Sequence, residues 1–248
     1  MANVVGKRIG GNLVYVDQGA SGMRVIDAIG PDVLKYEFLP WNHNIQDEDA
    51  TGADPEGFFT TVVEAGGGGT SECDRSNTPG ILAQLVTDNA ENDGISLQLV
   101  GEQFEFTSNQ SMVYFGIELD INDVDQSDLL VGICIEDTTL LGGLSDGVYI
   151  ESLDGATDTN GVAEKDSSET TTSASIGTLA DDTFHFLEFY YDGSSIYYFF
   201  DGTQSATIAT SNIPDDEALT FSLEFLTGET TAQTCDIRQA RAIMIGRT

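Results

Sequence analysis

The stretch from Thr183 to Ile208 holds three runs rich in Phe, Tyr, Ile and Thr, separated by two short turn sequences. Asp192-Gly193-Ser194 and Asp201-Gly202-Thr203 supply residues that tolerate positive φ, as the tight turns of antiparallel hairpins require. The sequence therefore predicts a three-stranded β-meander. Both alternating faces of its first strand are largely apolar, which is typical of a strand inside a two-sheet sandwich.

Strand patterns recur at short spacing from Gly80 onward, with almost no helical periodicity. Gly57 to Glu64 is expected as the first strand, and Lys165 to Ser175 as an edge strand or solvated loop. The prediction is an all-β chain with one sandwich of two antiparallel sheets. Beside the meander, the other expected strands are Ile81 to Thr87, Gly94 to Val100, Gln103 to Thr107, Ser111 to Ile121, Leu129 to Glu136, Gly147 to Ser152, Leu219 to Leu226 and Thr234 to Ile245.

The N-terminal segment differs in character from the rest of the chain. Asn12 to Asp17 reads as a strand, Pro31 to Phe38 as a short helix opened by a proline, and Gln46 to Glu56 as an acidic loop. We therefore expect residues 1–54 to form an extended arm and residues 55–248 to form the sandwich domain. The four glycines from Gly66 to Gly69 are expected in a loop.

The chain is folded but strongly acidic. Hydrophobic residues make up 40% of its 248 residues, while 9 Lys and Arg oppose 42 Asp and Glu for a formal charge of −33. A surface this negative repels nucleic acids and anionic membranes, so neither is expected as a partner. A salt-rich environment or a need for solubility at high copy number would each explain the charge. No apolar run has the length of a signal peptide or membrane span, so we expect synthesis and retention in a cytoplasm.

Three cysteines, Cys73, Cys134 and Cys235, lack any CxxC spacing. An odd number in a chain that is not secreted indicates reduced, buried thiols rather than a disulfide framework.

Several aromatic strands carry a resemblance at the level of the fold. Ser111 to Asp120, Phe184 to Tyr191, and Tyr197 to Gly202, which ends in Asp-Gly, resemble the strands of a concanavalin A-like (laminin G-like) jelly roll. The resemblance extends over about Gly57 to Thr248. It implies a jelly-roll β-sandwich.

A second resemblance rests on six longer segments of the chain: Gly11 to Asp17, Asp27 to Tyr36, Asp88 to Leu99, Asp125 to Glu151, Glu164 to Thr172 and Asn212 to Thr220. Together they resemble a family of structural proteins from the virions of tailed bacteriophages. The resemblance implies a non-enzymatic capsid decoration or cement protein on the exterior of the head, assembled in the host cytoplasm. The implied partner is the major capsid protein, with self-association around a local symmetry axis and no cofactor.

Five of the nine basic residues lie near the two ends of the chain. Sandwiches often bring their first and last strands together, so these residues could form one less acidic face that docks on the capsid. Chance placement of solvated residues is the alternative. The candidate docking residues are Lys7, Arg8, Arg238, Arg241 and Arg247.

One short motif suggests catalysis. Glu118-Leu119-Asp120 begins like the E-x-D-x-E or E-x-D-x-x-E motif of laminarinase-type glycoside hydrolases, in which two glutamates act as nucleophile and acid/base. The closing glutamate is missing here, because Asn122 and Asp123 occupy its positions. A hydrolase is therefore the weaker of two alternatives. The other is a lectin-like carbohydrate-binding module on the virion, which predicts exposed aromatic residues on loops.

Metal and nucleophile sites are not predicted. Asp120, Asn122, Asp123, Asp125 and Asp128 are rich in oxygen ligands but lack the glycine and closing glutamate of an EF-hand loop, so we interpret them as a solvated acidic turn. His43 and His185 are the only histidines, and His185 is expected to be packed or half-exposed within its strand.

Overall fold

The computed structural model describes residues 4–9, 11–17, 24–38, 57–64, 71–74, 78–209 and 211–246. Antiparallel strands dominate, and the one helical element among the described residues is the 3-10 turn η1 (Val124–Gln126). The all-β prediction is confirmed.

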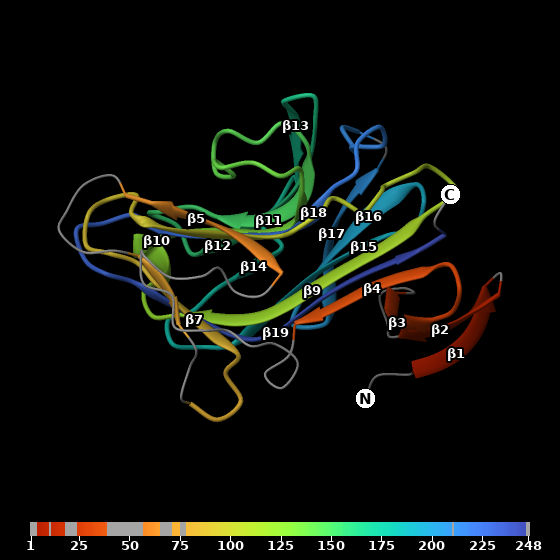
Figure 1. Ribbon diagram of the computed structural model, residues 1–248, viewed down its shortest axis with the longest axis horizontal. Coiled ribbons are helices and arrows are strands. Elements are labelled where there is room, and N and C mark those ends of the chain that lie inside the picture. Colours follow the sequence, from red (N-terminus) through yellow and green to blue (C-terminus); the bar gives the residue numbers. More distant parts are fainter. Residues whose placement is uncertain are drawn as a thin grey trace.

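Two large antiparallel sheets lie face to face (Figure 1). The first, which we call sheet I, has the order β17-β16-β15-β9-β19-β7-β6, and β4 also pairs with β19. Its strands are β4 (Val33–Phe38), β6 (Glu72–Asp74), β7 (Ala83–Val86), β9 (Met112–Ile121), β15 (His185–Tyr191), β16 (Ser195–Phe200), β17 (Thr203–Ala209) and β19 (Thr234–Ile245).

The second large sheet, sheet II, has the order β13-β12-β11-β10-β18-β8-β5, and β14 pairs with β12. Its strands are β5 (Phe58–Val63), β8 (Gly94–Leu99), β10 (Ser127–Cys134), β11 (Gly147–Ser152), β12 (Asp158–Lys165), β13 (Ser168–Thr171), β14 (Gly177–Thr178) and β18 (Thr220–Thr227).

Aromatic rings join the two sheets in the core. Phe115 of sheet I stacks on Phe189 with ring centroids 5.2 Å apart, and it meets Phe221 of sheet II at 5.5 Å. All three side chains are buried. Such aromatic pairs stabilise the fold beyond the burial of their area.

The predicted meander is confirmed as β15, β16 and β17. Gly193 takes φ 97° in the first turn, and Asp201 and Gly202 take φ 48° and 75° in the second. The turns thus use the left-handed conformations for which their residues were singled out.

Other expectations for individual strands have mixed outcomes. Gly57 to Glu64 forms β5, and the edge strand expected after Lys165 is β13. In Gln103 to Thr107, only an isolated bridge forms, between Phe104 and Leu219. No strand was expected over β12, because its sequence DTNGVAEK lacks β-branched and aromatic residues apart from one threonine and one valine.

The helix expected from Pro31 to Phe38 is wrong. Pro31 lies in a turn, and the residues after it form β4, which pairs with β19 along its whole length. Leu34 and Tyr36 pack against the core, and Phe38 is buried within it. This period of two is the pattern of a strand, and burial of three apolar side chains outweighs the helical signal of the proline.

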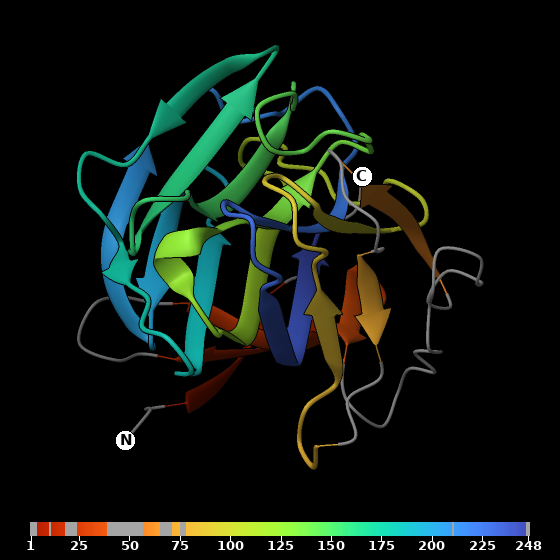
Figure 2. The same cartoon turned by 90° about the vertical axis from the view of Figure 1, so that its left-hand side faces the viewer.

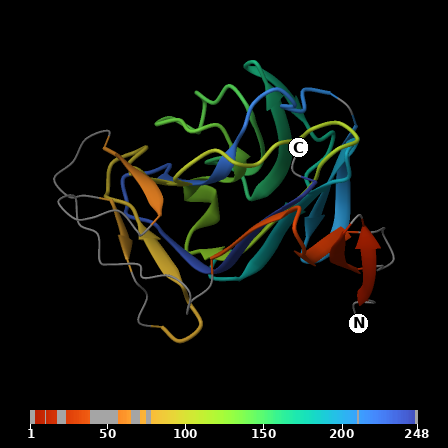
Figure 3. The same cartoon turned by 45° about the vertical axis from the view of Figure 1, so that its right-hand side comes forward.

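A third, smaller sheet covers the outer face of sheet I. It consists of β1 (Val4–Ile9), β2 (Asn12–Asp17) and β3 (Arg24–Ile29), in that order, and we call it the N-terminal sheet. Figures 2 and 3 show it packed beneath the sandwich. A separate apolar cluster fills the contact, formed by Val14, Val16, Val25 and Ala28 with Tyr114, Tyr190, Phe199, Ile243 and Ile245.

The expected arm is therefore not extended in its described part. Its residues 11–17 and 24–29 pack on the sandwich, and residues 33–38 belong to sheet I. The domain boundary at residue 54, the acidic loop Gln46 to Glu56 and the glycines Gly66 to Gly69 lie outside the described residues.

Cys73, Cys134 and Cys235 are buried free thiols, as predicted. None of the described residues forms a helix with the length and apolar character needed to cross a bilayer.

Candidate functional site

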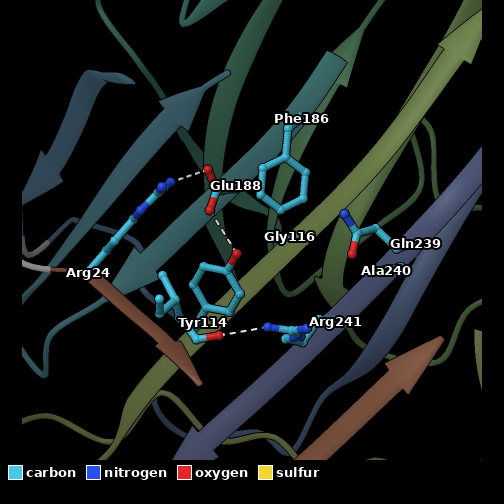
Figure 4. A pocket seen from close by; sticks show the side chains of 9 residues that line it. Arg24, Tyr114, Gly116, Phe186, Glu188, Gln239, Ala240 and Arg241 are labelled. Carbon is cyan, nitrogen blue, oxygen red and sulfur yellow. Dashed lines mark hydrogen bonds and ion pairs between the residues drawn. The ribbon is translucent and has the colours of Figure 1, made fainter. Parts of the chain in front are cut away.

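The candidate site lies on the outer face of sheet I. Because side chains alternate along a strand, β9 directs Val113, Phe115 and Ile117 into the core and Tyr114 and Gly116 to the opposite face. Where the N-terminal sheet meets this face, a pocket of about 220 Å³ remains. Figure 4 shows its lining: Arg24, Ile26, Tyr114, Gly116, Phe186, Glu188, Gln239, Ala240 and Arg241.

A buried carboxylate stands at the centre of this pocket. Glu188 has no exposed surface, and Tyr114 Oη donates a hydrogen bond to its Oε1 at 2.7 Å. Arg24 Nη1 donates to the other oxygen, Oε2, in an ion pair. Burial raises the pKa of Glu188, while Arg24 and Tyr114 oppose the increase by favouring the charged form.

Arg24 joins the N-terminal sheet to sheet I. Besides Glu188, it contacts Asp17 of β2, with Nη2 and Oδ2 3.2 Å apart. Its guanidinium also lies 5.2 Å from the centroid of the Phe199 ring, within the range of a cation-π contact. We call Arg24, Tyr114 and Glu188 the Arg24 lock, because these three side chains tie β3 to β9 and β15.

Gly116 makes room for the phenol of the lock. A Cβ atom at this position would lie 2.5 Å from Tyr114 Oη and 3.1 Å from Phe186 Cζ. The glycine in the middle of β9 therefore allows Tyr114 to reach Glu188 across the face of the sheet.

A second polar network lies beside the lock. Arg241 Nη1 donates to the carbonyl oxygen of Ile26 at 2.8 Å, and its Nε lies 3.1 Å from Glu37 Oε1. Lys35 Nζ lies 2.9 Å from Glu37 Oε1 and 2.7 Å from Asp27 Oδ1 of β3. The ion pairs and hydrogen bonds of Arg24, Lys35 and Arg241 thus all lie where the N-terminal sheet joins the sandwich.

The five candidate docking residues are not shown to form one face. Lys7 and Arg8 lie on β1, which is separated from β3 by β2, whereas Arg238 and Arg241 lie on β19. Arg241 belongs to the network just described. Arg247 lies outside the described residues.

Arg238 is held by its own neighbours. Its Nη1 donates to Glu118 Oε1 at 3.2 Å, and its guanidinium stacks on the Phe184 ring at 3.3 Å from the centroid. Gln239 Nε2 donates to the other Glu118 oxygen at 3.0 Å. Both oxygens of the glutamate in the hydrolase-like motif are therefore hydrogen-bonded within sheet I.

Asp120 of the same motif faces a like charge. It lies directly opposite Asp236 on β19. Burial, and then Asp236 and Asp182, raise its pKa to about 6. Part of the increase in the pKa of Asp120 therefore comes from repulsion between two aspartates that are paired across neighbouring strands.

Within the described part of the chain, no three carboxylates of the acidic stretch from Asp120 to Asp128 lie close enough together to share a metal ion, although Asp123 and Asp125 lie side by side. The described group that is close enough consists of Glu64, Asp88 and Asp93, whose carboxylate oxygens lie within 4.8 Å of one another. His185 is packed as expected, with Nδ1 2.9 Å from Asp201 Oδ2 and its ring against Phe200. His43 falls outside the described residues.

Comparisons with known proteins place the fold. No protein-family model and no curated protein sequence matches the chain. Among solved structures, a protein of unknown function from Shewanella oneidensis MR-1 is similar with a TM-score of 0.58 and 13% identity, covering 89% of this chain and 90% of that one.

Two further structures have a named activity. The carbohydrate recognition domain of Emp46p in its potassium-bound form has a TM-score of 0.53 and 11% identity, over 75% of this chain and 88% of that one. The endo-1,3-beta-glucanase from Streptomyces sioyaensis has a TM-score of 0.52 and 10% identity, over 77% and 89%. At such identities the likeness concerns the fold alone, and it confirms a concanavalin A-like jelly-roll β-sandwich.

Proposed function

We propose that the chain is a non-enzymatic structural protein of a tailed-phage virion that binds the outside of the assembled head. The resemblance of six sequence segments to virion structural proteins motivates the proposal. One structural observation supports it most: the N-terminal sheet covers the outer face of sheet I, and buried charged groups are used to attach it. The outer face of sheet I therefore serves to hold the N-terminal sheet against the sandwich.

The state of the carboxylates supports a role without catalysis. A retaining glycosidase needs two carboxyl groups about 5 Å apart that are free to act on the substrate. Glu188 has both oxygens bonded to Arg24 and Tyr114, and Glu118 has both bonded to Arg238 and Gln239. We therefore expect the protein to release no sugar from a β-1,3-glucan. Release that Glu118→Gln abolishes would favour the hydrolase instead.

Attachment to the capsid is assigned to β1. This strand stands at the end of the N-terminal sheet, so one of its edges has no strand partner among the described residues, and Arg8 on it is exposed. A strand of the major capsid protein could add to such an edge by main-chain hydrogen bonds. A ligand that binds only the assembled lattice stabilises it by mass action, and copies around a symmetry axis add avidity.

Charge reversal tests the attachment. In co-sedimentation with capsid shells of the phage that carries this sequence, Lys7→Glu with Arg8→Glu should reduce the bound fraction strongly. The matched control, Arg75→Glu with Lys165→Glu, changes the net charge equally and should bind nearly as the unchanged protein does. Equal losses would mean that net charge alone governs binding. Absence of binding by the unchanged protein would refute the proposed function.

A lectin-like role is the second candidate. The jelly-roll fold is shared with the carbohydrate recognition domain of Emp46p, which gives a fold and not a binding site. The specific observation in its favour is a polar pocket at another part of the sandwich.

A further inference from the structure

A second pocket, of about 420 Å³, opens at one end of the sandwich. Four connections meet there: the segment before β9, the turn between β15 and β16, the loop between β17 and β18, and the end of β12. We call it the end pocket. It is lined by Ser108, Asn109, Lys165, Tyr191, Ser194, Asn212, Ile213 and Asp215.

The inner wall of the end pocket carries a hydroxyl group that has no hydrogen-bond partner in the described part of the chain. Tyr191 is only 1% exposed, yet its hydroxyl makes no hydrogen bond within the described residues. Its ring packs against Phe106, with centroids 5.4 Å apart. Burial, and then Asp215 and Asp192, raise its pKa to about 12, so the hydroxyl keeps its proton and can donate. The hydroxyl oxygen is not enclosed by protein atoms but opens onto the end pocket, where a ligand or water can accept its hydrogen bond.

Two amides on the rim are held in place with their oxygens open. Asn109 Nδ2 donates to Ser108 Oγ at 3.1 Å, and Asn212 Nδ2 donates to Thr170 Oγ1 at 2.9 Å. In the described part of the chain, neither amide oxygen accepts a hydrogen bond. Both residues take left-handed backbone conformations, with φ 57° and 51°. The rim therefore offers two oriented acceptors beside the Tyr191 donor.

The charges of the end pocket exclude an anionic ligand. Lys165 is its one cation among the lining residues, and it forms ion pairs with both Asp215 and Asp216. Asp192 lies near enough to act on Tyr191 as well. A carboxylate, sulfate or phosphate would meet an excess of negative charge here.

We propose that the end pocket binds a neutral, hydroxyl-rich ring, a sugar residue of a glycan. Its volume falls in the range of small-molecule sites, and its lining combines an aromatic and an aliphatic side chain with a few fixed polar groups. Amide oxygens, serine hydroxyls and a tyrosine hydroxyl match the alternating donors and acceptors of sugar hydroxyl groups. No charge on the ligand is required.

The position of the end pocket is compatible with attachment through β1. The hairpin of β12 and β13, which carries Lys165 at its turn, lies at the top of the molecule in Figures 1, 2 and 3, whereas β1 lies lower and to one side. A protein held at β1 would leave the pocket facing away from the shell. The inference does not rest on capsid binding, because the pocket belongs to the sandwich itself.

A glycan array tests the proposal with the full chain, biotinylated and displayed as streptavidin tetramers to add avidity. The array carries neutral hexose and N-acetylhexosamine glycans beside sialylated, uronic and sulfated ones. Neutral glycans should be retained and acidic ones not. Tyr191→Phe and Asn212→Gly should each weaken retention roughly 3- to 10-fold, the usual effect of one lost hydrogen bond. Glycine at 212 keeps the left-handed conformation without strain.

Tyr197→Phe is the matched control. It makes the same change on the same hairpin, where Tyr197 donates to Asp192 outside the end pocket, and it should bind as the unchanged protein does. Thermal melting checks that each variant folds. If Asn212→Gly fails to fold, the glycan binding of Tyr191→Phe alone decides the test. The proposal is overturned by retention of no neutral glycan, by retention of acidic glycans only, or by unchanged binding in Tyr191→Phe. None of these results bears on co-sedimentation with capsids.

Discussion

Glu188 shows how single residues link distant parts of this chain. Its ion pair with Arg24 connects positions 164 residues apart, and the carboxylate is buried. A buried ion pair adds little net stability compared with apolar residues of the same shape, but removing one partner leaves an unpaired charge. The Arg24 lock therefore fixes where β3 sits on sheet I more than it strengthens the fold.

Removing the cation of the lock should be costly. We expect Arg24→Met to lower the free energy of unfolding by about 3–5 kcal/mol at pH 8, because the buried Glu188 and its neighbour Asp17 lose their shared counter-charge. Adding Glu188→Gln should restore much of this loss, because Gln can still accept from Tyr114 without a charge. Urea denaturation measures both. Lys165→Met, which breaks exposed ion pairs, should cost less than about 1 kcal/mol. A similar small loss for Arg24→Met would show that Glu188 is not held by Arg24.

The sequence could not reveal the lock, because no local pattern links Arg24 to Glu188. Rarity of positive charge drew attention to Arg238 and Arg241, and a motif drew attention to Glu118. The structure pairs Arg238 with Glu118 and Arg241 with Glu37. Residue type thus indicated which charged side chains form ion pairs. The partner of each one is set by strand pairing, which no local sequence pattern shows.

Among the elements, the N-terminal sheet is the main feature that strand patterns did not predict. The apolar character of both faces of β15 was the available signal. One face lies in the core, and Tyr190 on the other packs under β2 and β3. A two-sheet sandwich leaves that outer face to solvent, so its aromatic residues required a third layer. The meander and most strands of the sandwich could be predicted, because their periodicity and turns are local.

Two truncations separate the roles of these elements. A chain beginning at residue 31 loses the N-terminal sheet but keeps β4, and it should still melt cooperatively, at a lower temperature and with increased binding of a hydrophobic dye to the uncovered aromatic face. A chain beginning at residue 57 also loses β4 with the buried Phe38. Loss of a buried Phe side chain alone costs about 3–5 kcal/mol, so this chain should be much less stable.

Calorimetry of the two truncated chains is the measurement. Equal stability of both would show that β4 is dispensable and that residues 1–54 act as one unit. Failure of the longer chain to fold would place the N-terminal sheet within the core that folding requires.

Across the whole molecule, the charge of −33 is accompanied by carboxylates that the fold makes harder to ionise. On sheet II, burial raises the pKa of Glu224 to about 7, although the backbone N–H groups of Leu141 and Leu140 oppose the increase. Burial, and then Glu169, Glu164 and Asp128, raise that of Glu151 to about 7. Negative charge is thus crowded on this side of the sandwich as well.

Stability should therefore fall as the pH rises. Because the pKa values of Glu151 and Glu224 are raised in the folded state, the native protein holds protons that the unfolded chain has already released. The stability that these two groups contribute is complete below about pH 4.5 and is lost as the pH rises through about 7. The melting temperature should be higher at pH 5 than at pH 8. Glu224→Gln should raise it at pH 8 by about 2–12 °C, from roughly 1–3 kcal/mol. A higher melting temperature at pH 8 in the unchanged protein would contradict this assignment.

The central claim is the proposed place of this chain on the head of a tailed phage, and a cryo-EM reconstruction of the virions proposed to contain it tests that claim most directly. The proposed function predicts sandwich-shaped density in many copies on the outer surface of the head, with β1 of the N-terminal sheet against the major capsid protein and the hairpin of β12 and β13 pointing outward. Density for this chain at the tail or inside the shell, its absence from the particle, or a contact made through the outer face of sheet II would contradict it.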